Sequence, residues 1–380
     1  MDPRVRGDDN GASVKRKKLR RIGILTGGGD CPGLNAVIRA VVKTAIHDYG
    51  MAVLGIEDGY EGLLEKHARQ LTSDDVSGIL THGGTILGTS NTANPFHMPV
   101  EKGRKIVFQD QSGCALRHLK EWELDALVAV GGDGTLASAY RLFLKGIPVV
   151  GIPKTIDNDL GGTDYTFGFH TAVSIATDAL DRLHTTAASH HRVMILEVMG
   201  RNAGWIALYA GSAGGADIIL IPEIPFNMKV ICEQVRRRAG KGKRFSLVVV
   251  AEGAHPAGGQ QVIKQLDKKN PYPVKLGGVG QWLAKRIEEI TSLETRAAVL
   301  GHIQRGGTPT AFDRNLGTVF GTYAVYLLHK NCFGNMVSLQ GQRVGCVPLK
   351  DAVRQMKKVP LNHQLIKASK AVGTSFGARS

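Results

Sequence analysis

The chain has 380 residues, of which 43% are hydrophobic and 21% charged, and its 48 lysine and arginine residues against 33 acidic residues give a formal net charge of +15. These are ordinary globular proportions that exclude a disordered or fibrous chain, and the length favours two domains or one large one. The chain lacks an apolar run of the roughly 18 residues that a membrane span requires, and its five scattered cysteines argue against a disulfide framework or a zinc cluster. We therefore expect a soluble, cytoplasmic protein.

The first segment in chain order is a basic tail. A dense basic stretch begins in residues 1–20 and ends at the residue that follows, with six lysines and arginines between positions 15 and 21. A solvated tail is the simpler interpretation, because the sequence offers no aromatic-rich basic surface of the kind that binds nucleic acid. We predict a disordered basic tail over 1–20, no nucleic-acid partner and no membrane partner.

Short apolar runs follow, each succeeded by a glycine-bearing turn and then by a helical pattern. This alternation is typical of parallel sheets that are covered by helices on both faces. Because the runs outnumber the strands of one short sheet, we predict an α/β protein with two doubly wound, Rossmann-like lobes and the functional site in the cleft between them. The expected strands span 22–26, 53–56, 126–130, 149–152, 193–198, 218–221, 247–251 and 297–300, and the clearest helical patterns span 34–46, 136–144, 171–183, 279–290 and 316–328.

Two glycine-rich loops follow expected strands, where ligands bind in doubly wound folds. The loop at 27–33 leads into a helix and suits a phosphate, although Pro32 and Leu34 do not fit the common nucleotide fingerprints. The loop at 131–135 matches a degenerate dinucleotide pattern, which makes an NAD(P)-binding oxidoreductase an alternative. Asp133 argues against that alternative, because its carboxylate would repel a bare pyrophosphate and suits a site in which Mg²⁺ bridges acid and phosphate.

The loop at 153–159 carries the densest chemistry. Lys154, Asp157 and Asp159 lie within six residues, which is too polar for a core segment. In an extended segment the two aspartates point the same way, so one can accept a hydroxyl proton while the other orients the hydroxyl. Lys154 would supply a compact positive charge for a transferring phosphoryl group.

Two further loops, at 199–205 and 301–307, add basic groups after expected strands. Arg192 and Arg296 lie near the starts of the same two strands. As a set, these basic residues suit a phosphorylated, hydroxyl-rich ligand, because the guanidinium fork matches phosphate oxygens.

In this order the motifs resemble those of the phosphofructokinases. The resemblance runs from about Arg21 to about Lys330 and rests on the loops at 27–33, 131–135, 153–159, 199–204 and 301–307. It implies phosphorylation of fructose 6-phosphate at its 1-hydroxyl with ATP and Mg²⁺, a glycolytic step that gives fructose 1,6-bisphosphate. We expect a donor-binding lobe at 21–165 plus about 304–350 and a sugar-phosphate-binding lobe at 166–303 plus about 351–380.

The resemblance also implies roles for individual residues. Asp157 would be the catalytic base, with Lys154 and Arg201 assisting, and Asp133 would hold Mg²⁺. The donor would be bound by Gly29, Gly132, Asp133, Gly134 and Thr135. The sugar phosphate would be bound by Thr155, Asp157, Asp159, Met199, Gly200, Arg201, Glu252, His302 and Arg305, and by Arg192 and Arg296 of a neighbouring subunit. This last pair implies a homodimer or homotetramer with shared active sites.

The phosphoryl donor is the open question, because the family contains ATP users and pyrophosphate users. Gly134 leaves the nucleotide pocket open where pyrophosphate enzymes usually carry Asp, whereas Lys154 resembles the pyrophosphate users and a mixed subgroup that includes ATP users. An aspartate at position 134 would exclude a nucleotide by its bulk and charge, whereas Lys154 only adds a favourable charge. We therefore give Gly134 more weight and predict ATP, with a pyrophosphate-dependent phosphotransferase as the alternative. The same contacts would serve sedoheptulose 7-phosphate, and the sequence does not choose between the two sugars.

Overall fold

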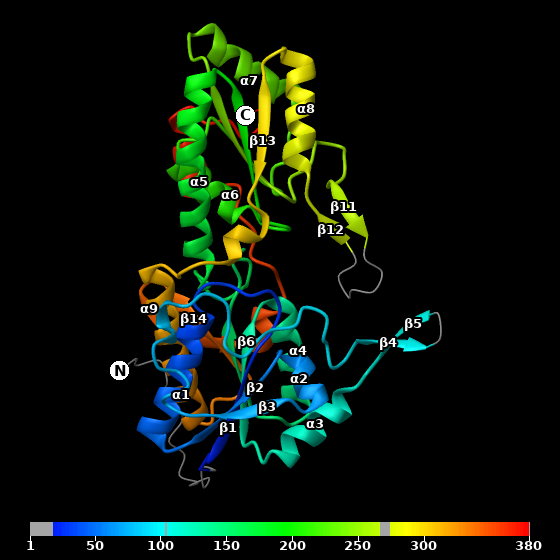
Figure 1. Ribbon diagram of the computed structural model, residues 1–380, viewed down its shortest axis with the longest axis vertical. Coiled ribbons are helices and arrows are strands. Elements are labelled where there is room, and N and C mark those ends of the chain that lie inside the picture. Colours follow the sequence, from blue (N-terminus) through cyan, green and yellow to red (C-terminus); the bar gives the residue numbers. More distant parts are fainter. Residues whose placement is uncertain (1–17, 103–104, 267–273, 380) are drawn as a thin grey trace.

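Two large sheets, one in each lobe, form the framework of the molecule (Figure 1). The computed structural model describes residues 18–102, 105–266 and 274–379. The sheet of the first lobe consists of β1 (Arg21–Thr26), β2 (Ala52–Ile56), β3 (Ala68–Leu71), β6 (Ala126–Gly131), β7 (Val149–Pro153), β14 (Asn335–Gln340) and β15 (Arg343–Pro348). Their order is β15-β14-β7-β6-β1-β2-β3, and only the edge strands β15 and β3 run antiparallel to their neighbours.

The sheet of the second lobe is smaller and wholly parallel. It consists of β8 (Val193–Val198), β9 (Ile218–Leu220), β10 (Ser246–Ala251) and β13 (Thr295–Val299), in the order β13-β8-β10-β9. Helices accompany both sheets: α1 (Leu34–Tyr49), α2 (Tyr60–Glu65), α3 (Ser112–Glu121), α4 (Asp133–Leu144), α5 (Phe169–His190), α6 (Trp205–Ala213), α7 (Met228–Gly240), α8 (Val279–Thr291), α9 (Ala311–His329), α10 (Leu349–Ala352) and α11 (Gln364–Ala371), with short 3₁₀ turns η1 (Ile79–Thr81) and η2 (Gly301–Arg305).

Alternate residues of each central strand enter different cores, because successive side chains in a strand point to opposite faces. In β6, Val128 packs in the core that contains α1 and α9, while Leu127 packs in the core that contains α2, α3 and α4. In β10, Val249 shares a core with α5 and α6, while Val248 shares one with α7 and α8. Helices therefore cover both faces of both sheets, as parallel strands require.

The chain crosses between the lobes three times within the described residues. The crossings are 154–168 between β7 and α5, 306–310 between η2 and α9, and 353–363 between α10 and α11. One hydrophobic core contains residues of both lobes, among them Ile22 of β1 and Leu247 of β10. The two lobes are therefore packed against each other and joined by three segments.

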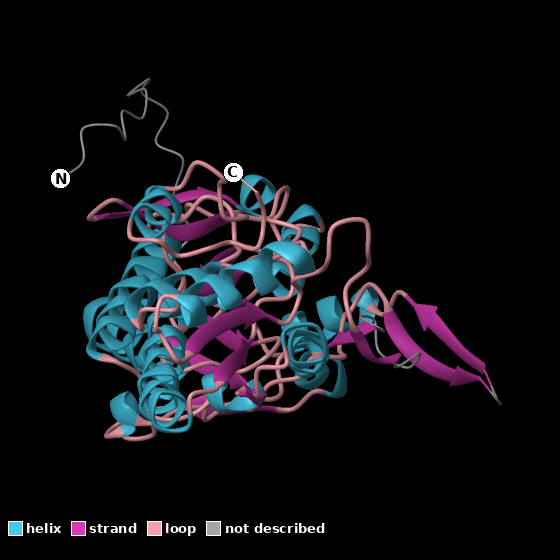
Figure 2. Cartoon of the chain, turned by 90° about the horizontal axis from the view of Figure 1, so that it is seen from above, coloured by secondary structure: helices cyan, strands magenta, loops and turns pink. Residues whose placement is uncertain are grey.

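Two antiparallel hairpins lie outside the large sheets. They are β4 (Met98–Lys102) with β5 (Lys105–Gln109), and β11 (Ile263–Leu266) with β12 (Val274–Leu276). One hairpin belongs to each lobe, and Figures 1 and 2 show them on the same side of the molecule.

The predicted α/β class is confirmed, and all eight expected strands occur within a few residues of their expected bounds. Strand β3 was not expected, because its sequence ARQL is mostly polar and only its last residue is buried. Helix α4 begins at Asp133 rather than at the expected residue 136, since Gly132 serves as its N-cap.

Most of the predicted tail at 1–20 lies outside the described residues. At its end Leu19 is buried and the amide of Arg20 donates to the Asp125 carboxylate at 2.7 Å, so residues 19–20 are packed on the first lobe. The strands of the first sheet fall within 21–153 and 335–348 and those of the second within 193–299, while the predicted domain boundaries stay a prediction. No described helix is long and apolar enough to cross a membrane, and the cytoplasmic location stays a prediction.

Candidate active site

Loops from the carboxyl ends of both sheets meet between the lobes. Arg305, at the end of η2 in the second lobe, donates from Nη1 to the carbonyl of Asp30 at 3.1 Å. A Cβ atom placed on Gly29 would lie 2.6 Å from the same guanidinium nitrogen, so the arginine packs directly on the 27–33 loop. This contact brings the loops after β1 and β13 into one site.

The 27–33 loop is held against the start of α4. The amide of Gly27 donates to the carbonyl of Val130 at 2.9 Å, and a Cβ atom on Gly27 would lie 2.7 Å from Oγ1 of Thr135. Thr135 is itself buried, and its carbonyl accepts a hydrogen bond from the Tyr60 hydroxyl at 2.8 Å. The close approach requires glycine at position 27, which explains part of the glycine-rich pattern.

The amino end of α4 presents free backbone N–H groups beside this loop. Asp133 and Gly134 occupy its first turn, and the Asp133 side chain is exposed. A helix of this length has positive potential at its amino end and leaves its first N–H groups unpaired, so it can bind an anion such as a phosphate. A flexible carboxylate at the same place can hold a divalent cation that accompanies the phosphate.

Lys154 lies beneath the 27–33 loop. Its side chain is only 3% exposed, and Nζ donates to the carbonyl of Gly29. Burial lowers the pKa of Lys154, while Asp30 and Asp133 favour its charged form. The ammonium therefore braces the loop that a donor phosphate would contact.

The loop after β7 is not the extended segment we expected. Residues 156–157 form a turn, and Asn158 has a left-handed backbone with φ of 51°. Even so, Thr155, Asp157 and Asp159 are half-buried and alternate with buried neighbours. Asp157 and Asp159 lie close enough for their charges to interact, while the expected common direction of their side chains stays a prediction.

The two aspartates of this loop are strongly desolvated. Burial raises the pKa of Asp157 to about 6, with the charges of Glu252 and Asp133 adding to the effect and Arg305 and Lys154 opposing it. Burial and the neighbouring Asp157 raise the pKa of Asp159 to about 7. A carboxylate whose pKa lies near neutral pH is suited to accept a proton from a hydroxyl.

In the second lobe, the buried Gln304 and the half-buried Glu223 fix the loop at 199–204. Oε1 of Gln304 accepts from the amide of Met199 at 3.4 Å, and the Glu223 carboxylate accepts from the amide of Gly204 at 3.1 Å. Glu252 follows β10 beside this loop; burial and the charge of Glu197 raise its pKa to about 7, while Arg305 and Arg201 lower it. The loop, Glu252 and Arg305 thus form the second half of the site.

Arg192 and Arg296 do not reach this site. They lie at the amino ends of β8 and β13, while the site lies at the carboxyl ends, about 15–20 Å away at ~3.3 Å per residue. Both arginines pair with Glu294, each at 2.7 Å. Arg192 and Arg296 therefore lie apart from the loops described above, while the assignment of the predicted residues to one site stays a prediction.

Several residues that shape the site had only a weak signal in the sequence. Glu197 is 2% exposed and accepts from the amides of Gly278 and Gly280 at the start of α8, at 2.9 and 2.8 Å. A lone carboxylate inside the apolar run VMILEV was a usable signal for it. Gln304 and Glu223 stand in loops where polar residues are common, so nothing distinguished them.

The carboxylates of the first lobe fit a divalent cation. Among described residues there is no group of three His, Cys, Asp or Glu side chains that could hold a metal. Mg²⁺, however, needs only one or two carboxylates when phosphate and water complete its shell. The charge of Asp133 adds to the raised pKa of Asp157, and Oδ1 of Asp157 is buried without a hydrogen-bond partner, so a cation nearby would relieve a real electrostatic cost.

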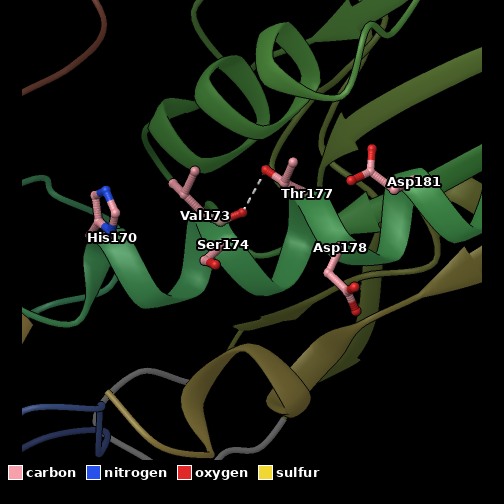
Figure 3. Close-up of a pocket in the computed structure, with 6 residues that line it drawn as sticks. All are labelled: His170, Val173, Ser174, Thr177, Asp178 and Asp181. Atoms are coloured by element: carbon pink, nitrogen blue, oxygen red, sulfur yellow. Dashed lines mark hydrogen bonds between the residues drawn. The ribbon is translucent and has the colours of Figure 1, made fainter. Parts of the chain in front are cut away.

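A separate hollow of about 380 Å³ lies along α5 (Figure 3). Residues of this one helix line it, from His170 to Asp181, and Oγ1 of Thr177 donates to the carbonyl of Val173 within it. Asp178 on its rim is paired with Arg182. None of its lining residues belongs to the loops described above, so the hollow is distinct from the site.

The chain is similar to known proteins both in sequence and in fold. The phosphofructokinase family model matches residues 21–328. A Clostridium perfringens protein named ATP-dependent 6-phosphofructokinase 2 is 52% identical over 360 residues, covering 94% of this chain and 98% of its own, and an Amycolatopsis methanolica protein named pyrophosphate–fructose 6-phosphate 1-phosphotransferase is 53% identical over 342 residues, covering 90% and 96%. The solved structure of phosphofructokinase from Saccharomyces cerevisiae matches 88% of this chain with a TM-score of 0.72 and 34% identity, and this chain spans 45% of that one. The chain belongs to the phosphofructokinase family.

Proposed function

We propose that the protein phosphorylates fructose 6-phosphate at its 1-hydroxyl, with ATP as donor, to give fructose 1,6-bisphosphate in glycolysis. One observation carries the proposal: the desolvated carboxylate of Asp157 lies between the 27–33 loop, with the start of α4, and the arginine-bearing loops of the second lobe. Family membership supports this reaction and sets aside the NAD(P)-binding oxidoreductase. A phosphoryl transfer to an alcohol requires a base that lies between the loops that bind the donor phosphates and the loops that bind the sugar.

In this proposal the chain's own residues do three things. Asp157 accepts the proton of the sugar hydroxyl while that hydroxyl oxygen attacks the terminal phosphorus of ATP and the bond from this phosphorus to ADP breaks. Asp159 and Thr155 orient the acceptor. Arg201 and Arg305 neutralise negative charge on the sugar phosphate and on the transferring group. Met199, Gly200, Glu252 and His302 complete the sugar pocket.

Residues of the first lobe hold the donor. Gly29, Gly132, Gly134 and Thr135 bring backbone N–H groups to its phosphates. Asp133 would hold Mg²⁺, which when bound neutralises phosphate charge in this class of reaction. Lys154 keeps the 27–33 loop in place from below.

ATP is favoured over pyrophosphate because Gly134 leaves room at the first turn of α4 for a nucleotide's inner phosphate. The pyrophosphate-dependent reaction is the second candidate, supported by Lys154 and by the name of the relative from Amycolatopsis methanolica. Arg192 and Arg296 belong to this function only if a neighbouring subunit presents them, so we propose a homodimer or homotetramer.

The decisive test is an initial-rate assay with fructose 6-phosphate and Mg²⁺, supplied with ATP or with pyrophosphate. We expect turnover with ATP and its loss by ~10²–10⁴-fold in Asp157→Asn, which is the contribution of a general base. Asp181→Asn, an exposed position on α5, is the matched control and keeps its activity. Turnover with pyrophosphate alone would reverse the choice of donor, and an active Asp157→Asn protein would reject the assignment of the base.

A further inference from the structure

The third crossing between the lobes, residues 353–363, touches both halves of the site. We call this segment the strap; it leaves α10 in the first lobe and enters α11 in the second. Its Lys357 has no role in the reaction proposed above, yet it makes more polar contacts than a surface lysine needs.

The ammonium of Lys357 is fully hydrogen-bonded to the loop that carries the base. Nζ donates to Oδ1 of Asn158 at 3.0 Å and to the carbonyls of Thr163 and Asp164, both at 2.9 Å. Three acceptors match the three N–H donors of an ammonium. Burial lowers the pKa of Lys357 to about 8, while Asp164 and Asp159 favour its charged form.

These bonds act on the residue between the two aspartates. Asn158 is 2% exposed and has a left-handed backbone, and its Oδ1 also accepts from the amide of Thr166 at 3.1 Å. The backbone amide of Lys357 donates to the carbonyl of Asp159 at 2.7 Å. Side chain and backbone of one lysine thus hold both residues that follow Asp157.

The other side of the strap contacts the loop of the second lobe. Nε1 of Trp205, the first residue of α6, donates to the carbonyl of Lys357 at 2.9 Å, and the ammonium lies 5.6 Å from the indole ring. The amide of Val359 donates to Glu223 at 2.8 Å, and the same carboxylate accepts from the amide of Gly204. The strap therefore joins the loop of Asp157 to the loop at 199–204 through a short series of hydrogen bonds.

We propose that Lys357 is a positioning residue that holds the Asp157 loop at a fixed distance from the sugar-binding loop, so that the base meets the acceptor hydroxyl. The inference rests on the proposed function, because it presumes that Asp157 is the base. Lys357 acts through Asn158 and Asp159 and contacts no reacting atom. A misplacement of about 1 Å at a reacting group can cost ~10²-fold in rate, so the loss of three bonds to this loop should be visible in turnover.

The test compares Lys357→Met, Lys357→Arg and Lys358→Met with the wild-type enzyme. Methionine keeps the length of the side chain and removes the ammonium, arginine keeps a charge and donors, and Lys358 is the exposed neighbour on the same strap. The readouts of this test are kcat and KM for both substrates, the equilibrium binding of fructose 6-phosphate, and the midpoint temperature of thermal unfolding of each variant.

We expect Lys357→Met to lower kcat by ~10- to 100-fold while the affinity for fructose 6-phosphate changes by less than about threefold. Lys357→Arg should recover part of the loss, and Lys358→Met should stay within twofold of wild type. A Lys357→Met enzyme with wild-type kcat would overturn the inference, as would a loss that is matched by the fraction of unfolded protein. If Asp157→Asn is inactive and Lys357→Met is normal, only this inference fails; if Asp157→Asn is active, the assignment of the base fails first.

Discussion

At the residue scale, the site depends on carboxylates kept in surroundings that disfavour their charge. The pKa of Asp157 is raised to about 6 chiefly by burial, against an ordinary value near 4. The sequence indicated which residue would be the base, because Asp157 belongs to a dense polar motif. It could not indicate the shift, because the shift arises from residues far apart in the chain, such as Glu252 and Arg305.

The raised pKa of Asp157 predicts an acid limb in the rate profile near pH 6. A general base works only when deprotonated, so kcat/KM should fall about tenfold per pH unit below that value. An unshifted aspartate would keep the rate flat down to about pH 4.5. Initial rates between pH 4.5 and 9 in buffers of constant ionic strength measure the limb, and a flat profile to pH 5 would contradict it.

The same desolvation predicts that the base weakens the fold at neutral pH. When the pKa of a carboxyl group is higher in the folded protein than in the unfolded one, the free energy of unfolding falls as the pH rises between the two pKa values. For Asp157 these are near 4 in the unfolded chain and near 6 in the folded protein. Asp157→Asn removes that charge, so at pH 8 it should raise the free energy of unfolding by about 1–3 kcal/mol. At pH 4.5 the difference should shrink, because the wild-type carboxyl is then largely protonated.

Denaturant unfolding at the two pH values measures this effect. Asp181→Asn, an exposed position, is the control and should show no such difference. An Asp157→Asn protein that is less stable than wild type at both pH values would show that the carboxylate is structurally required.

At the element scale, the amino end of α4 sets the space for the donor. The helix was expected three residues later than it begins, because Gly132, Asp133 and Gly134 read as a loop in the sequence. Glycine and aspartate have weak helix propensity, yet an N-cap glycine and a first-turn carboxylate are both compatible with a helix start. Because α4 begins at Asp133, Gly134 lies in its first turn, where the lack of a side chain leaves space for the donor.

We predict that Gly134→Asp lowers kcat/KM for ATP by ~100-fold or more. The added carboxylate would stand at the helix start and repel a nucleotide phosphate, by at least the several kcal/mol that like charges cost at such contacts. Folding should be unaffected, since a carboxylate in the first turn of a helix is favourable. Gly113→Asp, in the first turn of α3 where an added Cβ meets no atom within 4 Å, is the matched control.

Steady-state rates with ATP and with pyrophosphate measure the outcome. A Gly134→Asp enzyme that uses ATP normally would show that position 134 does not select the donor. A gain of activity with pyrophosphate would support the view that this position separates the two kinds of donor.

At the scale of the whole molecule, the central strands were predictable and the connections between lobes were not. Runs such as ALVAVG in β6 are apolar throughout because both faces of the sheet are covered, so they stand out in the sequence. The strap has no such signal: Lys357 is one of 48 basic residues, and its importance comes from what the fold brings to it. The four strands of the two hairpins and the edge pair β14 and β15 were also not expected.

Arg192 and Arg296 lie apart from the site of their own chain, and mixing inactive subunits tests whether they serve the site of a neighbouring subunit. If a neighbouring subunit supplies these arginines, each active site combines Asp157 of one chain with Arg192 and Arg296 of another. A dimer of one Asp157→Asn chain and one Arg192→Ala/Arg296→Ala chain then has one site with all defects and one site intact. Random pairing of equal amounts should restore about a quarter of wild-type activity, because half of the dimers are mixed and half of their sites are whole.

Co-expression of the two chains with different tags, followed by purification on both tags, isolates the mixed assembly. Pairing Asp157→Asn with Arg201→Ala is the control, because both residues belong to the same chain's site and each site of the mixed dimer keeps one defect. Recovery in the first pair and none in the second would require shared sites. If neither pair recovers although the mixed assembly forms, the arginines do not serve a neighbour's site, and their pairing with Glu294 at the amino ends of β8 and β13 is their whole role.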